Sequence, residues 1–286
     1  MTRRSRTSDQ PSTFHRPFTL SITRALGDQL AAALDTLTPA ALDLEHLHQV
    51  EKRAGVYQLY LRDEFVYVGK ADKDLRGRLT QHYKKLRGRQ NVPMAEVGFS
   101  CLYVNEDFSA LAPERLLIDH YRAQGGVPWN TNGFGSKDPG KNRDQTRIEM
   151  DHFDYLFPIN LDLGLSGLPD GEMPLGKFMA AVKKELPFLF RYANGGSAIS
   201  EPVQSQPEMT AHDAFTLIAR ALPDPWQVVA LPGYVVAYPN QPSEYQSSTR
   251  VYSRGGNWDD FSPIPSPEHA SYDEPGLADE DAQGED

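Results

Sequence analysis

Two short runs of aromatic and β-branched residues, GVYQLYL at 55–61 and FVYVG at 65–69, are separated only by the polar residues RDE. Residues of these types favour strands, and a short polar link between two such runs predicts an antiparallel β-hairpin. On paired antiparallel strands, residues two apart face the same side of the sheet. A tyrosine from each run, Tyr57 and Tyr67, can therefore project into one site.

Helix and strand patterns alternate around this hairpin. The segment LRGRLTQHYKKL at 75–86 predicts an amphipathic helix with its leucines pointing inward, and EVGFSCLYV at 96–104 predicts a third strand. APERLLIDHYRAQ at 112–124 predicts a helix with a proline in its first turn, and the periodicity at 21–37 and 40–50 predicts a helical lead-in. We expect an α/β (α+β) fold, with a small, mainly antiparallel sheet flanked by helices and a C-terminal extension.

Shifts in composition divide the chain into five expected regions. These are a flexible basic arm at 1–18, the main domain with its decorations at 19–195, a linker at 196–208, a small α/β appendage at 209–240, and a loop with a disordered acidic tail at 241–286.

Cysteine content and hydropathy indicate a cytoplasmic protein. Cys101 is the one cysteine, so an internal disulfide is excluded and a reducing compartment is expected. No run approaches the roughly 20 apolar residues of a membrane span, and the basic start of the chain lacks the apolar core of a secretory signal.

The net charge of −10 is distributed unevenly. Residues 201–286 carry a net charge of −12, and residues 1–200 carry +2. Within the first part, residues 70–89 hold eight lysines and arginines against two aspartates, as a phosphate-binding surface requires. We expect DNA contacts from this cationic segment and from the basic loop NTNGFGSKDPGKNR that ends at residue 143. The expected contact residues are Lys73, Arg76, Lys84, Lys85, Arg87, Arg89, Lys137, Lys141 and Arg143.

Further polar residues can join the two tyrosines. Arg78 and His82 are four apart on the predicted helix and share a face. Glu114 lies in the first turn of the next helix, and the loop after that helix brings Asn130. Taken singly, such residues more often pack or face solvent than act in a site, so their joint order carries the argument.

That order resembles the GIY-YIG nuclease superfamily. Its two signature triplets correspond to GVY at 55–57 and YVG at 67–69, with valine in place of isoleucine in both. The family's arginine, histidine, glutamate and asparagine match Arg78, His82, Glu114 in PERLLIDHY and Asn130 in PWN, over a core of about residues 53–132. The text PWNTNGFGSKDPGKNR, followed by LPFLFRY, is similar to the branch that serves as type II restriction endonucleases.

The resemblance implies a role for each matched residue. Tyr57 would accept the proton of the attacking water, and either Lys70 or His82 would lower the cost of activating this phenol. Arg78 would brace the phosphate in the transition state, while Tyr67 and Asn130 would orient phosphate and backbone. Glu114, as the single acidic ligand, would hold one divalent ion, expected to be Mg²⁺.

The expected function is cleavage of double-stranded DNA to 5′-phosphate and 3′-hydroxyl ends by a type II restriction endonuclease. The expected partners are a second copy of the chain on a palindromic, GC-rich site and a DNA methyltransferase. A repair or homing nuclease and a non-catalytic DNA-binding module remain alternatives, although a zinc module ligated by cysteines is excluded because the chain has one cysteine.

Overall fold

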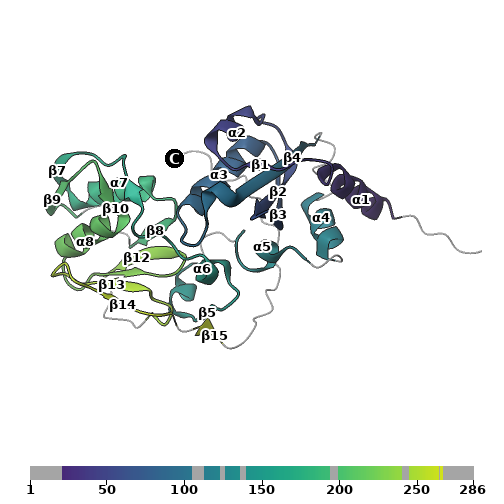
Figure 1. The fold of residues 1–286 in the computed structure, drawn as a ribbon. Coiled ribbons are helices and arrows are strands. Elements are labelled where there is room, and N and C mark those ends of the chain that lie inside the picture. Colours follow the sequence, from purple (N-terminus) through teal and green to yellow (C-terminus); the bar gives the residue numbers. More distant parts are fainter. Residues whose placement is uncertain are drawn as a thin grey trace, which may run out of the picture.

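A computed structural model describes residues 21–104, 113–122, 126–135, 140–193, 199–239, 245–263 and 265–266. The basic arm at 1–18, the acidic tail after residue 266 and Lys137 lie outside these residues, as do the side chains of Glu114 and Lys141. Figure 1 shows a first half built on a small sheet and a second half built on a larger one. Among the described residues, none of the helices has the length and apolar character that crossing a membrane requires.

The predicted hairpin is confirmed. Strands β2 (Gly55–Leu61) and β3 (Glu64–Ala71) pair in antiparallel fashion, and Tyr57 lies opposite Gly69. Arg62 and Asp63 form the turn between them at φ 54° and 63°. Positive φ at both central residues is the geometry of a type I′ turn, whose twist matches that of the strands it joins.

Strand β4 (Val97–Tyr103) pairs with the other edge of β2, and the short β1 (Ala40–Ala41) pairs with β4. The resulting order is β1-β4-β2-β3, with all pairings antiparallel. The expected small antiparallel sheet is therefore confirmed.

Alternation along β2 and β3 divides the sheet into two faces. Tyr57, Leu59 and Tyr67 pack with the leucines of α3 (Leu75–Arg87). Val56 and Val68 pack on the other face with residues of α1 (Ile22–Leu34) and α4 (Pro113–Arg122). Figure 1 shows these helices on opposite sides of the sheet. The tyrosines therefore share a face with α3.

Shorter elements complete the first half and lead into the second. They are α2 (Leu44–Gln49), the 3₁₀ turn η1 (Met94–Glu96), α5 (Pro128–Thr131), the 3₁₀ turn η3 (Lys141–Gln145), β5 (Ile148–Glu149) and α6 (Phe153–Leu156). α3 begins at its N-cap Asp74, whose carboxylate accepts a hydrogen bond from the amide of Gly77. Of these elements, α5 packs against β3 and thereby reaches the tyrosine face.

The second half contains a five-stranded sheet in the order β14-β13-β11-β12-β8. Helices α7 and α8 share one apolar core with this sheet. The elements are β6 (Gly164–Leu165), β7 (Gly171–Pro174), α7 (Leu175–Glu185), β8 (Leu189–Tyr192), β9 (Pro202–Ser205), β10 (Met209–Thr210), α8 (Ala211–Ala221), β11 (Gln227–Ala230), β12 (Tyr234–Tyr238), β13 (Arg250–Tyr252), β14 (Trp258–Asp260) and β15 (Pro265–Ser266).

The structure differs from the expected linker and loops in this half. Residues 202–205 lie within the expected linker, and they form β9, which pairs with β7. Residues 250–252 and 258–260 lie within the expected C-terminal loop, and they form strands that extend the larger sheet. β8 pairs in parallel with β12, so the expected appendage shares its core with the segment before the linker. These strands have only three or four residues, so the sequence offers little strand pattern over them. Pairing with distant strands decides their conformation.

A buried ion pair ties the end of α3 to α6, the short helix that leads into the second half. Arg89, just after α3, donates to the carboxylate of Asp154 in α6 at 2.7 Å, and the Arg89 side chain is 4% exposed. Two main-chain hydrogen bonds lie beside it: the amide of Gln90 donates to the carbonyl of Pro158, and the amide of Asn160 donates to the carbonyl of Gly88. Arg89 is therefore a structural residue here, and the expectation that it contacts DNA is corrected.

We predict that Arg89→Met lowers the free energy of unfolding by roughly 3 kcal/mol, because removal of one partner leaves the Asp154 carboxylate buried without its main cation. Urea denaturation followed by circular dichroism measures the change. Arg87→Met is the matched control, since Arg87 is exposed two residues earlier, and should change stability by about 0.5 kcal/mol or less. Equal effects of the two substitutions would contradict the structural role of Arg89.

Candidate active site

The hydroxyl of Tyr57 lies between two residues of α3. Its oxygen is 2.6 Å from Nε2 of His82, and Nε of Arg78 donates to it at 3.3 Å. Tyr57 is fully buried, and His82 is 5% exposed. Arg78 and His82 reach the same atom because one helical turn separates them. The structure thus brings together three of the residues expected in the site.

Gly69 makes room for this arrangement. A Cβ atom at Gly69 would lie 2.4 Å from the Tyr57 hydroxyl oxygen, well inside contact distance. The glycine of the second triplet is therefore required by the phenol on the neighbouring strand. Tyr67 also reaches this face, with its ring centroid 6.0 Å from that of Tyr57 and 5.5 Å from that of His82.

His82 is held in its neutral form. Burial lowers its pKa well below the ordinary value of 6.5, and the nearby charges of Arg78 and Lys85 lower it further. A neutral imidazole whose Nε2 accepts the phenol proton carries its own proton on Nδ1. In that tautomer, neutral His82 offers the lone pair of Nε2 to the Tyr57 hydroxyl.

Of the two residues expected to activate Tyr57, His82 is the one in contact with its hydroxyl. Lys70 follows Gly69 on β3, and its amine bonds the carboxylate of Asp72 at 3.0 Å. Direct contact therefore favours His82 as the group that receives the phenol proton.

Asn130 lies in the short helix α5 rather than in a loop, and both of its amide atoms bond the main chain of β3. Oδ1 accepts from the amide of Val68 at 2.9 Å, and Nδ2 donates to the carbonyl of Val68 at 2.8 Å. Val68 is the middle residue of the second triplet, so Asn130 fixes the strand that carries Tyr67 and Gly69. The structure thus gives the Asn130 side chain a protein partner at the site.

The expected metal ligand, Glu114, lies in the first turn of α4, a helix that packs against β3. Within the described part of the chain, no group of three or more His, Cys, Asp or Glu residues could hold a metal ion. One carboxylate fits Mg²⁺, an ion that keeps several waters and is often bound through one or two carboxylates and a substrate phosphate.

The cationic segment at 70–89 separates into two groups. Lys73, Lys84 and Arg87 are exposed. Arg76 donates to the carbonyl of Val50 at 2.5 Å, while the amine of Lys85 donates to the carbonyl of Phe134. Burial lowers the pKa of Lys85 to about 8. Lys85 is thus half-buried with its amine on an internal carbonyl, and the expectation that it contacts DNA stays a prediction.

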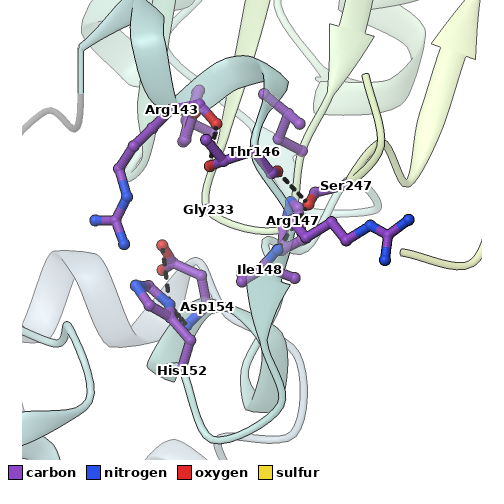
Figure 2. A pocket seen from close by; sticks show the side chains of 11 residues that line it. Arg143, Thr146, Arg147, Ile148, His152, Asp154, Gly233 and Ser247 are labelled. Carbon is purple, nitrogen blue, oxygen red and sulfur yellow. Dashed lines mark hydrogen bonds and ion pairs between the residues drawn. The ribbon is translucent and has the colours of Figure 1, made fainter. Parts of the chain in front are cut away.

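Arg143 lies elsewhere, in a cavity of about 50 Å³ between η3 and the turn before β12. Figure 2 shows Arg143 extending toward Asp154 and His152, while Arg147 points the other way. His152 packs against Gly133, where a Cβ would lie 2.4 Å from its Nε2. This cavity therefore borders the segment that leads from Asn130 to Phe134.

Sequence reasoning missed Phe134, His152 and Arg147. NGFG at 132–135 belongs to the basic loop NTNGFGSKDPGKNR, and nothing in its pattern indicates that the aromatic residue packs on the site. Phe134 is 1% exposed and touches both His82 and Tyr67.

Comparison with known families agrees with this geometry. Residues 53–126 match the family model described as the GIY-YIG catalytic domain. The match spans both triplets, Arg78, His82 and Glu114, and it ends before Asn130. The comparison with curated proteins found no match. We conclude that the chain carries, at residues 53–126, a domain similar to the GIY-YIG catalytic domain, and such a domain indicates a nuclease.

Proposed function

We propose that the protein is a metal-dependent, sequence-specific endonuclease that hydrolyses double-stranded DNA to 5′-phosphate and 3′-hydroxyl ends. The observation that carries this proposal is the Tyr57 hydroxyl held between the imidazole of His82 and the guanidinium of Arg78. Hydrolysis of a phosphodiester needs a group that takes a proton from water and a cation beside the phosphate oxygens. These three side chains supply both.

In the proposed reaction, Tyr57 takes the proton of the attacking water and passes its own proton to Nε2 of His82. A phenol titrates near 10, so forming phenolate at pH 7 without assistance would cost about 4 kcal/mol. Simultaneous transfer to His82 avoids a free phenolate. The positive charges of Arg78 and Lys85 oppose protonation of His82. In the proposed complex, the negative charge of the DNA phosphate offsets this opposition.

Arg78 places a permanent positive charge at the Tyr57 hydroxyl, where charge develops on the attacked phosphate. Tyr67 shares the same face and would orient the phosphate. Asn130, through its two bonds to Val68, holds the strand that carries Tyr67. In this scheme it is a positioning residue.

A divalent ion, proposed to be Mg²⁺ held by Glu114, would stabilise charge on the phosphate and the leaving oxygen.

The exposed cations indicate how DNA would lie. Lys73, Lys84 and Arg87 are exposed on or next to α3, and we propose that they bind backbone phosphates. Arg143 and Arg147, which line the cavity in Figure 2, suit contacts to phosphate or to guanine in the major groove.

We propose the type II restriction class for two reasons: the segments PWNTNGFGSKDPGKNR and LPFLFRY resemble that branch, and the chain adds a large second half to the nuclease domain. A five-stranded sheet with two helices is added to the small nuclease core. In this proposal it works in the cytoplasm with a DNA methyltransferase that protects the host site. A repair or homing nuclease is the second candidate, and digestion of a sequenced plasmid with Mg²⁺ tests the choice. Discrete, palindromic cut sites would support restriction, whereas cuts governed by DNA structure would support repair.

We predict that Tyr57→Phe and Glu114→Ala lower the cleavage rate by at least about a hundredfold, because they remove the proposed proton acceptor and the proposed metal ligand. Single-turnover cleavage measures the rate, and a gel shift in Ca²⁺ measures DNA affinity. Affinity should stay near that of the wild type, since exposed cations supply it. Tyr155→Phe, a hydroxyl removed outside the site, is the control. Near-parental turnover in Tyr57→Phe or Glu114→Ala would contradict the mechanism.

We also predict that the protein acts as a homodimer, since a palindromic site presents two equivalent strands to a chain with one active centre. Sedimentation with and without the cognate duplex measures the stoichiometry. Two chains per duplex are expected. A one-to-one complex that cuts both strands in a single encounter would contradict this prediction.

A further inference from the structure

Phe134 forms a wall of the candidate active site. Its ring stacks on the imidazole of His82, with a centroid distance of 5.1 Å and an interplanar angle of 19°. Its ring also meets that of Tyr67 in an edge contact at 4.9 Å. Phe134 thus touches two of the residues proposed to act on DNA, although it is far from both in sequence.

The stacking matters because the His82 ring has few polar contacts. Among the described residues, the hydrogen bond of the His82 ring is the one between Nε2 and the Tyr57 hydroxyl, at 2.6 Å. A catalytic imidazole is usually oriented by a bond to its second nitrogen. Here the plane of the ring is set by packing between Phe134 and the tyrosines.

Lys85 also contacts Phe134. Its amine donates to the carbonyl of Phe134 and lies 4.8 Å from the centroid of that ring. The same amine lies 5.3 Å from the ring of Phe153. Lys85 and His82 are three residues apart on α3, so one helix face presents both the imidazole and the amine that seats its stacking partner.

We propose that Phe134, seated by Lys85, is a positioning residue for DNA cleavage: it sets the direction in which Nε2 of His82 meets the Tyr57 hydroxyl. The proposal rests on the function proposed above for Tyr57 and His82. An apolar ring stacked on an imidazole also excludes water, which favours the neutral form that accepts the phenol proton.

A smaller side chain at this position should therefore change both the geometry and the protonation of His82. The groups that face His82 are Tyr57 from β2, Tyr67 from β3, and Arg78 and Lys85 from α3 itself. The charges of Arg78 and Lys85 remain in a Phe134 variant, so a rise in the His82 pKa would report the loss of burial.

The test compares Phe134→Leu with Phe157→Leu. Phe157 belongs to the same aromatic cluster and packs on Trp129 and Phe153. Both substitutions remove aromatic packing and should lower stability. Only Phe134→Leu should lower kcat, by at least about tenfold, with DNA affinity unchanged within about twofold, because a positioning residue acts on the chemical step.

Histidine NMR supplies a readout that a purely structural role would not move. In Phe134→Leu, we expect the His82 pKa to rise toward 6.5 and the acid limb of the cleavage profile to move to higher pH, because the neutral imidazole is lost below its pKa. In Phe157→Leu, the His82 pKa should stay in place. An unchanged His82 pKa in Phe134→Leu would overturn the positioning role, whereas a wild-type protein that cuts no DNA would overturn the proposed function.

Lys85→Met provides a second variant in case Phe134→Leu does not fold. It also removes a cation that lowers the His82 pKa, so its readout is the ring-current shift that Phe134 imposes on the His82 ring protons. Loss of this shift is expected if Lys85 seats Phe134. Lys183→Met, which removes an amine placed over the Tyr192 ring in the second half, is the control. An unchanged ring-current shift in Lys85→Met would overturn the role of Lys85.

Discussion

The register of β2 against β3 is the constraint on which the site depends. Tyr57 lies opposite Gly69, and the missing Cβ leaves the space that the phenol occupies. A shift by one residue would place the tyrosines on the face that α1 and α4 cover. The turn at Arg62 and Asp63 starts this pairing, and an irregularity between Leu59 and Tyr60 shifts it by one residue, so that Tyr57 meets Gly69.

Burial then sorts the polar groups of α3 by role. The helix carries cations on several faces, and the contacts of each cation depend on how far it is buried. Arg78 meets the Tyr57 hydroxyl, Lys85 seats Phe134, and Lys84 is exposed. A cation withdrawn from solvent must find an internal partner, because an unpaired buried charge is strongly destabilising. The basic segment therefore combines an exposed cationic surface with internal contacts.

The two halves of the molecule meet behind this site. Residues 157–160 bond the end of α3 on one side and the turn before β12 on the other. The ion pair of Arg89 with Asp154 lies in the same region, next to Phe153, whose ring meets that of Phe134. The bond from the amide of Ile159 to the carbonyl of Pro232 connects this region to the turn before β12 in the larger sheet.

Local patterns in the sequence determined the hairpin, α3 and the shared helix face of Arg78 and His82. Turn chemistry, strand propensity and helical spacing act over a few residues, so one sequence is enough to show them. The order of these residues also indicated the nuclease domain. Only the tertiary structure decided that Asn130 binds the main chain of Val68, that Lys85 and Arg89 turn inward, and that residues 202–205 and 250–252 are strands. Those outcomes depend on partners far away in the chain, and a single sequence does not show which distant residues meet.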